Sequence, residues 1–332
     1  MKLAEFESKV SRAVNAELEE YVGSAFAGSL SDLKGIFFYH LGLENNGNSG
    51  KRIRPLLTAL CAAGAGADWE KSIPAACAIE LIHNFSLIHD DIEDMGDLRR
   101  GRQAVWKKWG LAKGVNSGDA MFVSAFDILT HNDVLDCEKT LTCLQVLSNT
   151  CLFLTEGQEL DIGFEQRDYI SREEYFHMVE GKTAALIACC AKTGAIIGGL
   201  SLEEQNHFSE FGNQLGIAFQ IQDDWLGIWG DPKITGKSAS SDLLEKKKSY
   251  PVVLGFELSE RFTTRWKSGS IKQEDIPGIL EILENDGIKA MVEADSARMT
   301  KLAFEILHSL LCKVEVISML EELTNKLLTR KN

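Results

Sequence analysis

The stretch from residue 73 to residue 101 joins an apolar segment to an acidic one with no loop between them. Residues 75–88 are mostly Ala, Cys, Ile, Leu and Phe on several helical faces, which predicts a buried helix. The run His89-Asp90-Asp91-Ile92-Glu93-Asp94 follows directly. Asp90 and Asp94 lie one turn apart, where their charges repel each other and add to the negative end of the helix dipole. A cation must compensate, and carboxylates at this spacing suit Mg²⁺, which completes its shell with water and substrate phosphate.

A second acidic pair, Asp223-Asp224, follows the apolar residues 215–221. One such pair by itself indicates a solvated helix end. Here both acidic groups end apolar helices, and both are followed by basic runs, Arg99-Arg100-Gly101-Arg102 and Lys246-Lys247-Lys248. We therefore expect one cavity with carboxylates on facing walls and cations close by to bind an anion.

Composition favours one continuous α-helical domain over residues 1–332, since the chain has five Pro, no Gly/Ser linker and no internal repeat. The net charge of −14 makes nucleic acid an unfavourable partner. Eight Cys without a Cys-x-x-Cys pair are expected to be reduced core residues of a cytoplasmic protein, not zinc ligands. The charged N-terminus argues against a signal peptide, and no apolar run is long enough to predict a transmembrane segment.

The apolar periodicity predicts helices over most of the chain. The expected helices cover residues 3–21, 31–43, 116–130, 141–164, 202–229, 290–311 and 314–328, with another beginning at an N-cap, Ser171. Lys51, Arg52 and Arg54 open a further helix, where cations oppose the dipole unless an anion is bound. The polar, Gly-containing residues 230–238 are a candidate lid over the site.

An ordered set of motifs resembles the trans-isoprenyl diphosphate synthases, or polyprenyl synthetases, over nearly the whole chain. In chain order, the matching motifs are Gly50-Lys51-Arg52-Ile53-Arg54-Pro55, Glu80-Leu81-Ile82-His83, Asp90–Asp94 with Arg99-Arg100-Gly101, Gly157-Gln158-Glu159-Leu160-Asp161, Lys182-Thr183, Phe219-Gln220-Ile221-Gln222-Asp223-Asp224, Gly230-Asp231-Pro232, Thr235-Gly236-Lys237 and Lys247. The resemblance implies an all-α helical bundle around a central cavity, the isoprenoid synthase fold. It also implies a homodimer and a Mg²⁺-dependent, head-to-tail condensation of isopentenyl diphosphate with dimethylallyl, geranyl or farnesyl diphosphate.

The same resemblance implies roles for individual residues. Two or three Mg²⁺ ions would bind Asp90, Asp94 and Asp223, with Asp91 and Asp224 in support. The allylic diphosphate would be held by Arg99, Lys182, Lys237 and Lys247, with Thr183 and Gln220 facing the reacting carbons. Isopentenyl diphosphate would be held by Lys51, Arg54, His83 and Arg100, with Arg52 in the same basic cluster. The departing diphosphate would take the proton released after addition, so no His–Asp base is expected.

The chain departs from the family pattern at three positions. Gly227 stands where the second motif usually has its third Asp, and we expect little effect because the first Asp is the direct ligand. Gln103 and Trp106 replace the Pro and His that usually follow Arg-Arg-Gly. These two replacements bear on the fine placement of isopentenyl diphosphate.

Product length should depend on the side chains that block the tunnel beneath the first acidic motif. Phe85 lies five residues before Asp90, about one turn deeper on nearly the same face, whereas Ser86 is small. One aromatic at this depth resembles short-chain enzymes that make fifteen- or twenty-carbon products, farnesyl or geranylgeranyl diphosphate. Phe122 and Phe126 are the next candidates for the floor, and His89 is interpreted as structural.

Two alternatives remain compatible with the sequence. A class I terpene cyclase would share the helical fold and an Asp-rich motif. It would lack the Lys51/Arg54 cluster and the set formed by Lys182, Lys237 and Lys247. A non-catalytic regulatory subunit of a heteromeric prenyl synthase would have lost metal ligands, and the departures at Gly227, Gln103 and Trp106 keep that hypothesis open.

Overall fold

The computed structural model describes residues 2–28, 30–44, 50–230 and 240–328. The chain divides into two compact units. The first unit contains Met1–Asn149, Cys189–Ser209 and Leu311–Leu320, and the second contains Thr150–Ala188, Glu210–Leu310 and Glu321–Asn332. Four of the five boundaries fall inside helices, and the fifth, between Leu310 and Leu311, lies in the short connection after Ser309. The single domain expected from the sequence stays a prediction.

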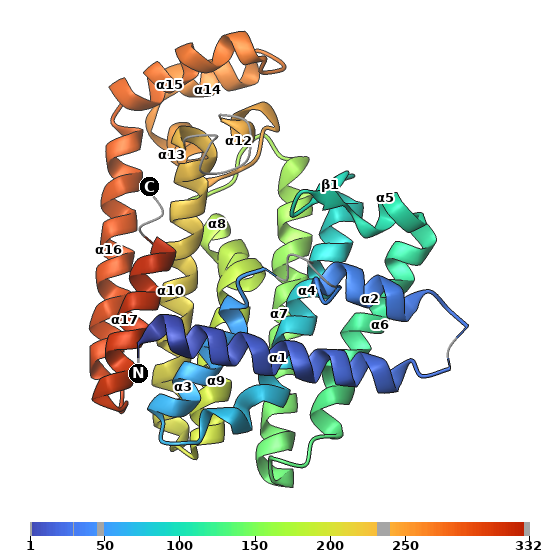
Figure 1. The fold of residues 1–332 in the computed structure, drawn as a ribbon. Helices are drawn as coiled ribbons and strands as arrows, with labels where there is room; N and C mark the ends of the chain where they lie inside the picture. Colours follow the sequence, from blue (N-terminus) through green and yellow to red (C-terminus); the bar gives the residue numbers. More distant parts are fainter. Residues whose placement is uncertain (1, 29, 45–49, 231–239, 329–332) are drawn as a thin grey trace. The chain divides into compact units, whose positions relative to one another are not determined.

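The first unit begins with helices and one small hairpin (Figure 1). They are α1 (Leu3–Ala25), α2 (Leu33–Leu41), α3 (Ile53–Gly64), the 3-10 helix η1 (Trp69–Ser72), α4 (Ile73–Glu93), β1 (Leu98–Arg99), β2 (Arg102–Gln103), α5 (Val105–Trp109) and α6 (Leu111–Thr130). Two longer helices, α7 (Cys137–Glu165) and α9 (Ala185–Gly198), belong partly to each unit.

Helix α4 is the central element of the first unit, because α1, α3 and α6 all pack against it. Its residues from Ile73 to Ile82 are buried without exception, as the apolar sequence predicts. The helix ends at Glu93, and the C-cap Asp94 donates its backbone N–H to the carbonyl of Asp90. The predicted buried helix with an acidic end is therefore confirmed.

The second unit is built around a separate apolar core. Its elements are the helix α8 (Arg172–Val179), the π-helix η2 (Glu180–Ala184), most of α10 (Leu202–Trp229), α12 (Ser241–Leu244), α13 (Tyr250–Leu258), α14 (Glu260–Lys267), the 3-10 helix η3 (Gln273–Asp275), α15 (Ile276–Asn285), α16 (Ile288–Ser309) and part of α17 (Val314–Leu328). Ser171 caps α8 in a capping box with Glu174, which confirms the predicted N-cap.

The observed helix ends show where the local apolar pattern was enough to predict the boundaries. Both α10 and α17 span the predicted residues, whereas α6 begins at Leu111, five residues before the prediction. Gly110, with φ of +92°, forms the break in front of α6. Gly114 is accepted inside the helix because its Cα faces Trp106, where a Cβ would lie 3.0 Å from the Trp106 Cβ. The basic run that begins at Arg99 lies in a small antiparallel hairpin, in which Leu98 pairs with Gln103 and Arg99 with Arg102.

The cysteine prediction was wrong for two of eight residues. All eight thiols are free and six are buried, but Cys137 is exposed and Cys312 is partly exposed. Cys137 begins α7 and Cys312 follows the end of α16, where the chain reaches the surface. Among the described residues, no helix combines the length and apolar character needed to cross a membrane.

Candidate active site

The first acidic group divides into solvent-facing and buried carboxylates. Asp94 is exposed and Asp90 is partly buried, whereas Asp91 is only 2% exposed. The Arg99 guanidinium donates Nε (2.9 Å) and Nη2 (2.6 Å) to Asp91 Oδ1. Burial raises the pKa of Asp91, and the hydrogen bond from Arg99 opposes that rise. Asp91 Oδ2 is buried without a hydrogen-bond partner among the described residues, so the contact with Arg99 satisfies only one of the two oxygens of this carboxylate.

Arg52 lies inside the protein, unlike its neighbour Lys51, which is exposed. The Arg52 Nη1 donates to Glu80 (2.8 Å), Nη2 to the Leu41 carbonyl (2.7 Å) and Nε to Asn15 (3.0 Å). The Arg52 guanidinium therefore donates hydrogen bonds to acceptors on α1, α2 and α4. The structure thus makes Arg52 a residue that positions the Lys51 loop, and we do not assign it a substrate contact.

Arg54 and Arg100, on the first unit, lie close enough to His83 for their charges to act on its imidazole. Burial, followed by the charges of Arg54 and Arg100, holds the pKa of His83 well below its usual range. A neutral imidazole between two guanidiniums can donate one hydrogen bond without adding charge. The Arg100 side chain reaches the His40 carbonyl at 3.4 Å and Asn84 Oδ1 at 3.5 Å.

His40 was missed by the sequence reasoning. It is buried, and its Nε2 has no hydrogen-bond partner among the described residues. Burial, with the charges of Arg100 and Arg99, lowers the pKa of His40 to about 3. No local signal distinguishes it, because its position beside the arginines arises from packing of α2.

Three basic residues in the described part of the chain have left-handed backbone conformations that L-residues rarely adopt. Their φ angles are +46° at Arg52, +53° at Arg100 and +53° at Lys246. Each is next to a residue predicted to bind a diphosphate. Such strain costs about 1–3 kcal/mol and persists where surrounding structure over-determines it, often at functional sites.

The second acidic group has the same division as the first. Asp223 is exposed, whereas Asp224 is buried and accepts three hydrogen bonds. The donors are the Tyr175 hydroxyl (2.6 Å), the Tyr250 backbone N–H (2.7 Å) and Gln220 Nε2 (2.7 Å). Burial raises the pKa of Asp224 to about 7, against the effect of these hydrogen bonds. Asp224 thereby joins α8, α10 and α13, and leaves Asp223 to face outward.

Gln220 has a defined orientation. Its Nε2 donates to Asp224, so its Oε1 accepts from the Thr183 hydroxyl at 2.8 Å. Thr183 lies in the π-helix, which follows α8 without a break. Lys182 precedes it and forms an ion pair with Asp161 of α7. The sequence did not predict the π-helix, a feature often found at functional sites.

Glycines on three helices let their backbones meet at Lys182 and Thr183. A Cβ on Gly157 would lie 2.2 Å from the Lys182 backbone nitrogen, and one on Gly181 would lie 2.6 Å from the Phe153 carbonyl oxygen. A Cβ on Gly216 would lie 2.5 Å from the Ala184 Cα. These contacts press α7 and α10 against the π-helix.

The remaining predicted basic residues are less constrained. Lys247 is exposed and pairs with Glu245 at 3.1 Å. Lys237 and nearly all of the candidate lid, residues 231–238, lie outside the described residues.

An aromatic row lies between α4 and α6 in the first unit. The Phe85 ring is 5.0 Å from the Phe122 ring, and Phe122 is 5.2 Å from Phe126, all edge-to-face. Phe85 and Ser86 are partly exposed, as side chains lining a tunnel would be. His89 packs over Gly118, whose Cβ would lie 2.1 Å from the imidazole Nε2, in agreement with a structural role.

Two departures from the family pattern have local structural roles. Trp106 Nε1 donates to the Gly96 carbonyl (2.8 Å) and so closes the chain behind the acidic run. The Gln103 backbone carbonyl accepts from the Tyr39 hydroxyl at 3.0 Å. Arg102 stacks 3.6 Å above that Tyr39 ring, so the hairpin is fixed to α2.

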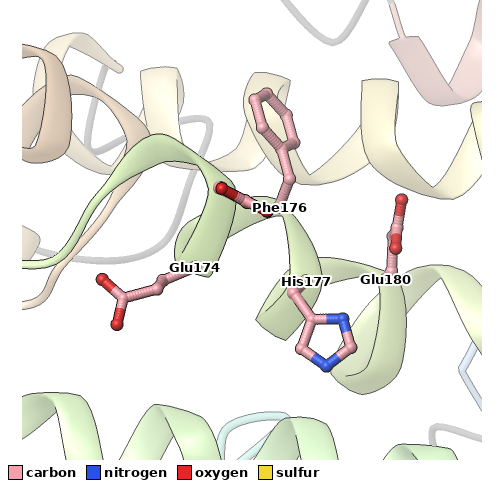
Figure 2. Close-up of a pocket in the computed structure, with 5 residues that line it drawn as sticks. Glu174, Phe176, His177 and Glu180 are labelled. Carbon is pink, nitrogen blue, oxygen red and sulfur yellow. The ribbon is translucent and has the colours of Figure 1, made fainter.

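A pocket of about 600 Å³ lies on the second unit at α8 (Figure 2). It is lined by Glu173, Glu174, Phe176, His177 and Glu180. None of the predicted site residues lines it. Its carboxylates would repel a diphosphate, so it is unsuited to either predicted substrate.

The donor chemistry nevertheless fits Mg²⁺. No three His, Cys, Asp or Glu side chains among the described residues gather closely enough to hold a metal by themselves. Mg²⁺ does not require that, since one or two carboxylates with water and substrate phosphate complete its octahedron. Asp90 and Asp94, one turn apart, and the outward-facing Asp223 provide such oxygens.

Comparison with known proteins decides the family. The polyprenyl synthetase model matches residues 38–283. The chain belongs to this family. It is 36% identical over 282 residues to "(2E,6E)-farnesyl diphosphate synthase" of Mycobacterium tuberculosis, covering 80% of this chain and 77% of that one. It is 40% identical over 265 residues to "Short chain isoprenyl diphosphate synthase" of Methanothermobacter thermautotrophicus, covering 78% and 81%.

A polyprenyl synthetase fold is all-α, and the solved structures agree. Geranylgeranyl pyrophosphate synthase from Corynebacterium glutamicum, complexed with isoprenyl diphosphate and magnesium, has a TM-score of 0.86 to this chain. The identity is 27%, over 99% of this chain and 100% of that one. This polyprenyl synthetase is thus a short-chain prenyltransferase, and the comparisons do not favour a terpene cyclase or a non-catalytic subunit.

Proposed function

We propose that this polyprenyl synthetase condenses isopentenyl diphosphate with an allylic diphosphate to give farnesyl or geranylgeranyl diphosphate. One observation carries the proposal. In both acidic groups, one carboxylate (Asp91 or Asp224) is buried and hydrogen-bonded to protein, and another (Asp94 or Asp223) is exposed. The buried carboxylates would fix the two helix ends in place, and the more exposed ones would bind Mg²⁺. Ionisation of a diphosphate requires such metal-bound charge beside the leaving group.

The first unit supplies the isopentenyl diphosphate site. Lys51, Arg54 and Arg100 neutralise its phosphates, and His83 adds a neutral hydrogen-bond donor. The buried pair between Arg52 and Glu80 positions this cluster and makes no contact with substrate. That the two units' groups line one cavity stays a prediction of the sequence.

The allylic diphosphate is held by Arg99, Lys182, Lys247 and Lys237. The bond between its first carbon and the diphosphate oxygen breaks, and the electron pair leaves with the diphosphate. When bound, Mg²⁺ at Asp90, Asp94 and Asp223 supplies positive charge that stabilises this leaving group, and two or three ions are proposed. The carbonyl and hydroxyl oxygens of Gln220 and Thr183 face the carbocation.

The double bond of isopentenyl diphosphate then attacks the carbocation and forms the new carbon–carbon bond. The product loses a proton to the departed diphosphate. Water would quench the cation, so apolar walls such as the Phe85 and Phe122 rings keep the reacting carbons dry. Those rings also set where the growing chain stops.

Incubating the purified protein with isopentenyl diphosphate and dimethylallyl, geranyl or farnesyl diphosphate tests the proposal, with product mass as readout. We expect fifteen- or twenty-carbon diphosphates, and none from Asp90→Ala, whose circular dichroism should match that of the unchanged protein. Absence of any elongated product with all three starters would refute it. Light scattering of the same sample tests the proposed homodimer.

A further inference from the structure

Asn84 is a polar residue in the buried part of α4. Its side chain has no exposed surface (0%), and most of the residues that α4 buries are apolar. Asparagine is unfavourable in a helix interior, and a buried amide costs free energy unless it is hydrogen-bonded. The hydrogen bonds that Asn84 makes therefore show what the amide does at this position.

The amide of Asn84 has a defined orientation. Its Nδ2 donates to the backbone carbonyl of Glu80 at 2.7 Å and to Glu80 Oε1 at 3.1 Å. An ionised carboxylate only accepts hydrogen bonds, so the reverse orientation would set two acceptors against each other. The Oδ1 of Asn84 therefore points away from Glu80, and it accepts a hydrogen bond from Nη2 of Arg100 at 3.5 Å. Asn84 thus joins the buried pair of Arg52 and Glu80 to Arg100.

Arg100 is held by neutral acceptors. Besides its contact with Asn84, it donates Nη1 to the backbone carbonyl of His40 at 3.4 Å. A Cβ on Gly50 would lie 3.3 Å from the Arg100 Cζ, so the guanidinium lies against the backbone directly before Lys51. Both hydrogen bonds are long, and a guanidinium has five N–H donors, so these contacts place Arg100 without saturating it.

The charge of Arg100 is not paired as the charges of two neighbouring arginines are. Arg52 pairs with Glu80 at 2.8 Å, and Arg99 pairs with Asp91 at 2.6 Å. Arg100 forms no such ion pair with a carboxylate in the part of the chain that the structure describes; its acceptors are an amide and a backbone carbonyl. Burial lowers the pKa of Arg100, and the nearby arginines lower it further, whereas Glu80 opposes them. A half-buried cation in this setting is stabilised by an anion from outside the chain.

We propose that Asn84 is a positioning residue for isopentenyl diphosphate, because it fixes the Arg100 guanidinium through a neutral acceptor and leaves its charge available for phosphate. A carboxylate at position 84 would hold Arg100 but neutralise it, and an apolar side chain would leave the guanidinium unplaced. The inference rests on the proposed function, since Arg100 is one of the cations assigned there to isopentenyl diphosphate. Asn84 itself belongs to none of the motifs that assigned that site.

Two variants of the same shape separate the hydrogen bonds from packing. Asn84→Thr keeps them, because a threonine hydroxyl in a helix donates to the carbonyl four residues earlier, here that of Glu80, and can accept from Arg100. Asn84→Val has neither bond. Calorimetric titration of the full chain with isopentenyl diphosphate should show binding weaker by about tenfold or more in Asn84→Val, and within about threefold of the unchanged protein in Asn84→Thr. Equal dissociation constants in the two variants would overturn the proposal.

Asn84→Asp tests the role of charge. This variant keeps the shape of the side chain and an acceptor for Arg100, but it adds a carboxylate that neutralises the guanidinium. It should bind isopentenyl diphosphate about tenfold or more weakly than the unchanged protein. Binding within about twofold would overturn the proposal. Circular dichroism checks that each variant is folded, and Asn84→Asp decides the question if Asn84→Val is not.

Steady-state kinetics distinguish a positioning role from a structural one. Asn84→Val should raise the KM for isopentenyl diphosphate by about tenfold or more, with the KM for the allylic diphosphate and kcat within about threefold of the unchanged values. Thr193→Val is the matched control, since it removes a buried hydroxyl elsewhere in the first unit, and it should leave all three constants unchanged. If Asn84→Val changes both KM values equally, Asn84 only packs α4 and the proposal fails.

The outcomes separate this inference from the proposed function. If no elongated product forms but isopentenyl diphosphate binds and the Asn84 variants weaken binding as expected, the proposed reaction fails and the positioning role stands. If products form and Asn84→Val binds isopentenyl diphosphate as the unchanged protein does, the reaction stands and the inference fails.

Discussion

Gly157→Ala should disturb the active site through a single methyl group. The new Cβ would lie 2.2 Å from the Lys182 nitrogen, 2.7 Å from the Gly181 carbonyl carbon and 2.9 Å from its Cα. Ordinary contacts begin at 3.4 Å, so α7 and the π-helix must separate by about 1.2 Å. All three neighbours are backbone atoms, so no side chain can rotate away to relieve the clash.

The energetic balance favours destabilisation. Overpacking of this kind costs about 1–3 kcal/mol, and the better helix propensity of alanine returns about 1 kcal/mol. The net loss of up to about 2 kcal/mol should lower the melting temperature by up to roughly 3 °C, at an unfolding entropy of about 2.1 cal/mol/K per residue. Displacing Lys182 and Thr183 by about 1 Å should reduce turnover on the order of 10²-fold, a larger effect than the stability loss explains.

Gly163→Ala is the matched control, because Gly163 lies exposed on the same helix and a Cβ there would meet no atom within 4 Å. That variant should be slightly stabilised, by up to about 1 kcal/mol, with unchanged activity. Thermal unfolding followed by circular dichroism and steady-state product formation measure both effects. Equal stability and turnover in the two variants would refute the reasoning.

Four further expectations follow from the structure. Excess chelator should abolish turnover and added Mg²⁺ restore it, whereas full activity in chelator would end the metal assignment. Lys51→Ala should mainly raise the KM for isopentenyl diphosphate, and Lys182→Ala should mainly raise the KM for the allylic substrate. Each change should weaken binding of its own substrate by about 1.5–3 kcal/mol, and equal effects on both substrates would contradict the assignment of these two residues to separate diphosphate sites. Phe85→Ala should lengthen products by at least one five-carbon unit at a stability cost below ~3–5 kcal/mol, and Ser86→Phe should shorten them; unchanged product masses in both would place the tunnel floor elsewhere. Because the pKa of His40 is lowered to about 3 in the folded protein, this residue takes up a proton between pH 6.5 and 4.5 only in the unfolded chain. The free energy of unfolding, measured by denaturant titration, should therefore fall by about 2–3 kcal/mol between pH 7 and 4.5, and His40→Gln should lack this part of the decrease. The same pH dependence in His40→Gln and the unchanged protein would contradict this expectation.

Local sequence determined the helices and the order of the chemical groups. The apolar residues before Asp90 and before Asp223 predict α4 and α10, because burial of a continuous apolar surface depends on side-chain periodicity alone. The N-cap Ser171 was equally readable, since a capping box is a contact between residues three apart. The family motifs added the assignment of roles.

Tertiary structure alone decided which member of each group faces outward. Asp91 and Asp223 are chemically the same side chain, yet Arg99 packs against one and nothing covers the other enough to bury it. Arg52 carries a guanidinium that could bind phosphate, but inside the protein it donates a hydrogen bond to Glu80, which lies 28 residues later in the chain. Burial and ion pairing depend on residues distant in the chain, which periodicity does not report.

The π-helix and the Asp242 carboxylate show the same limit at closer range. Gly157 and Gly181 are ordinary helix glycines in the sequence, and only the structure shows that their backbones meet at the π-helix that carries Thr183. Likewise, only the structure shows that a Cβ on Gly227 would lie 2.1 Å from Oδ2 of Asp242. Backbone approach and filled volume are properties of packed helices, so tertiary structure decided them.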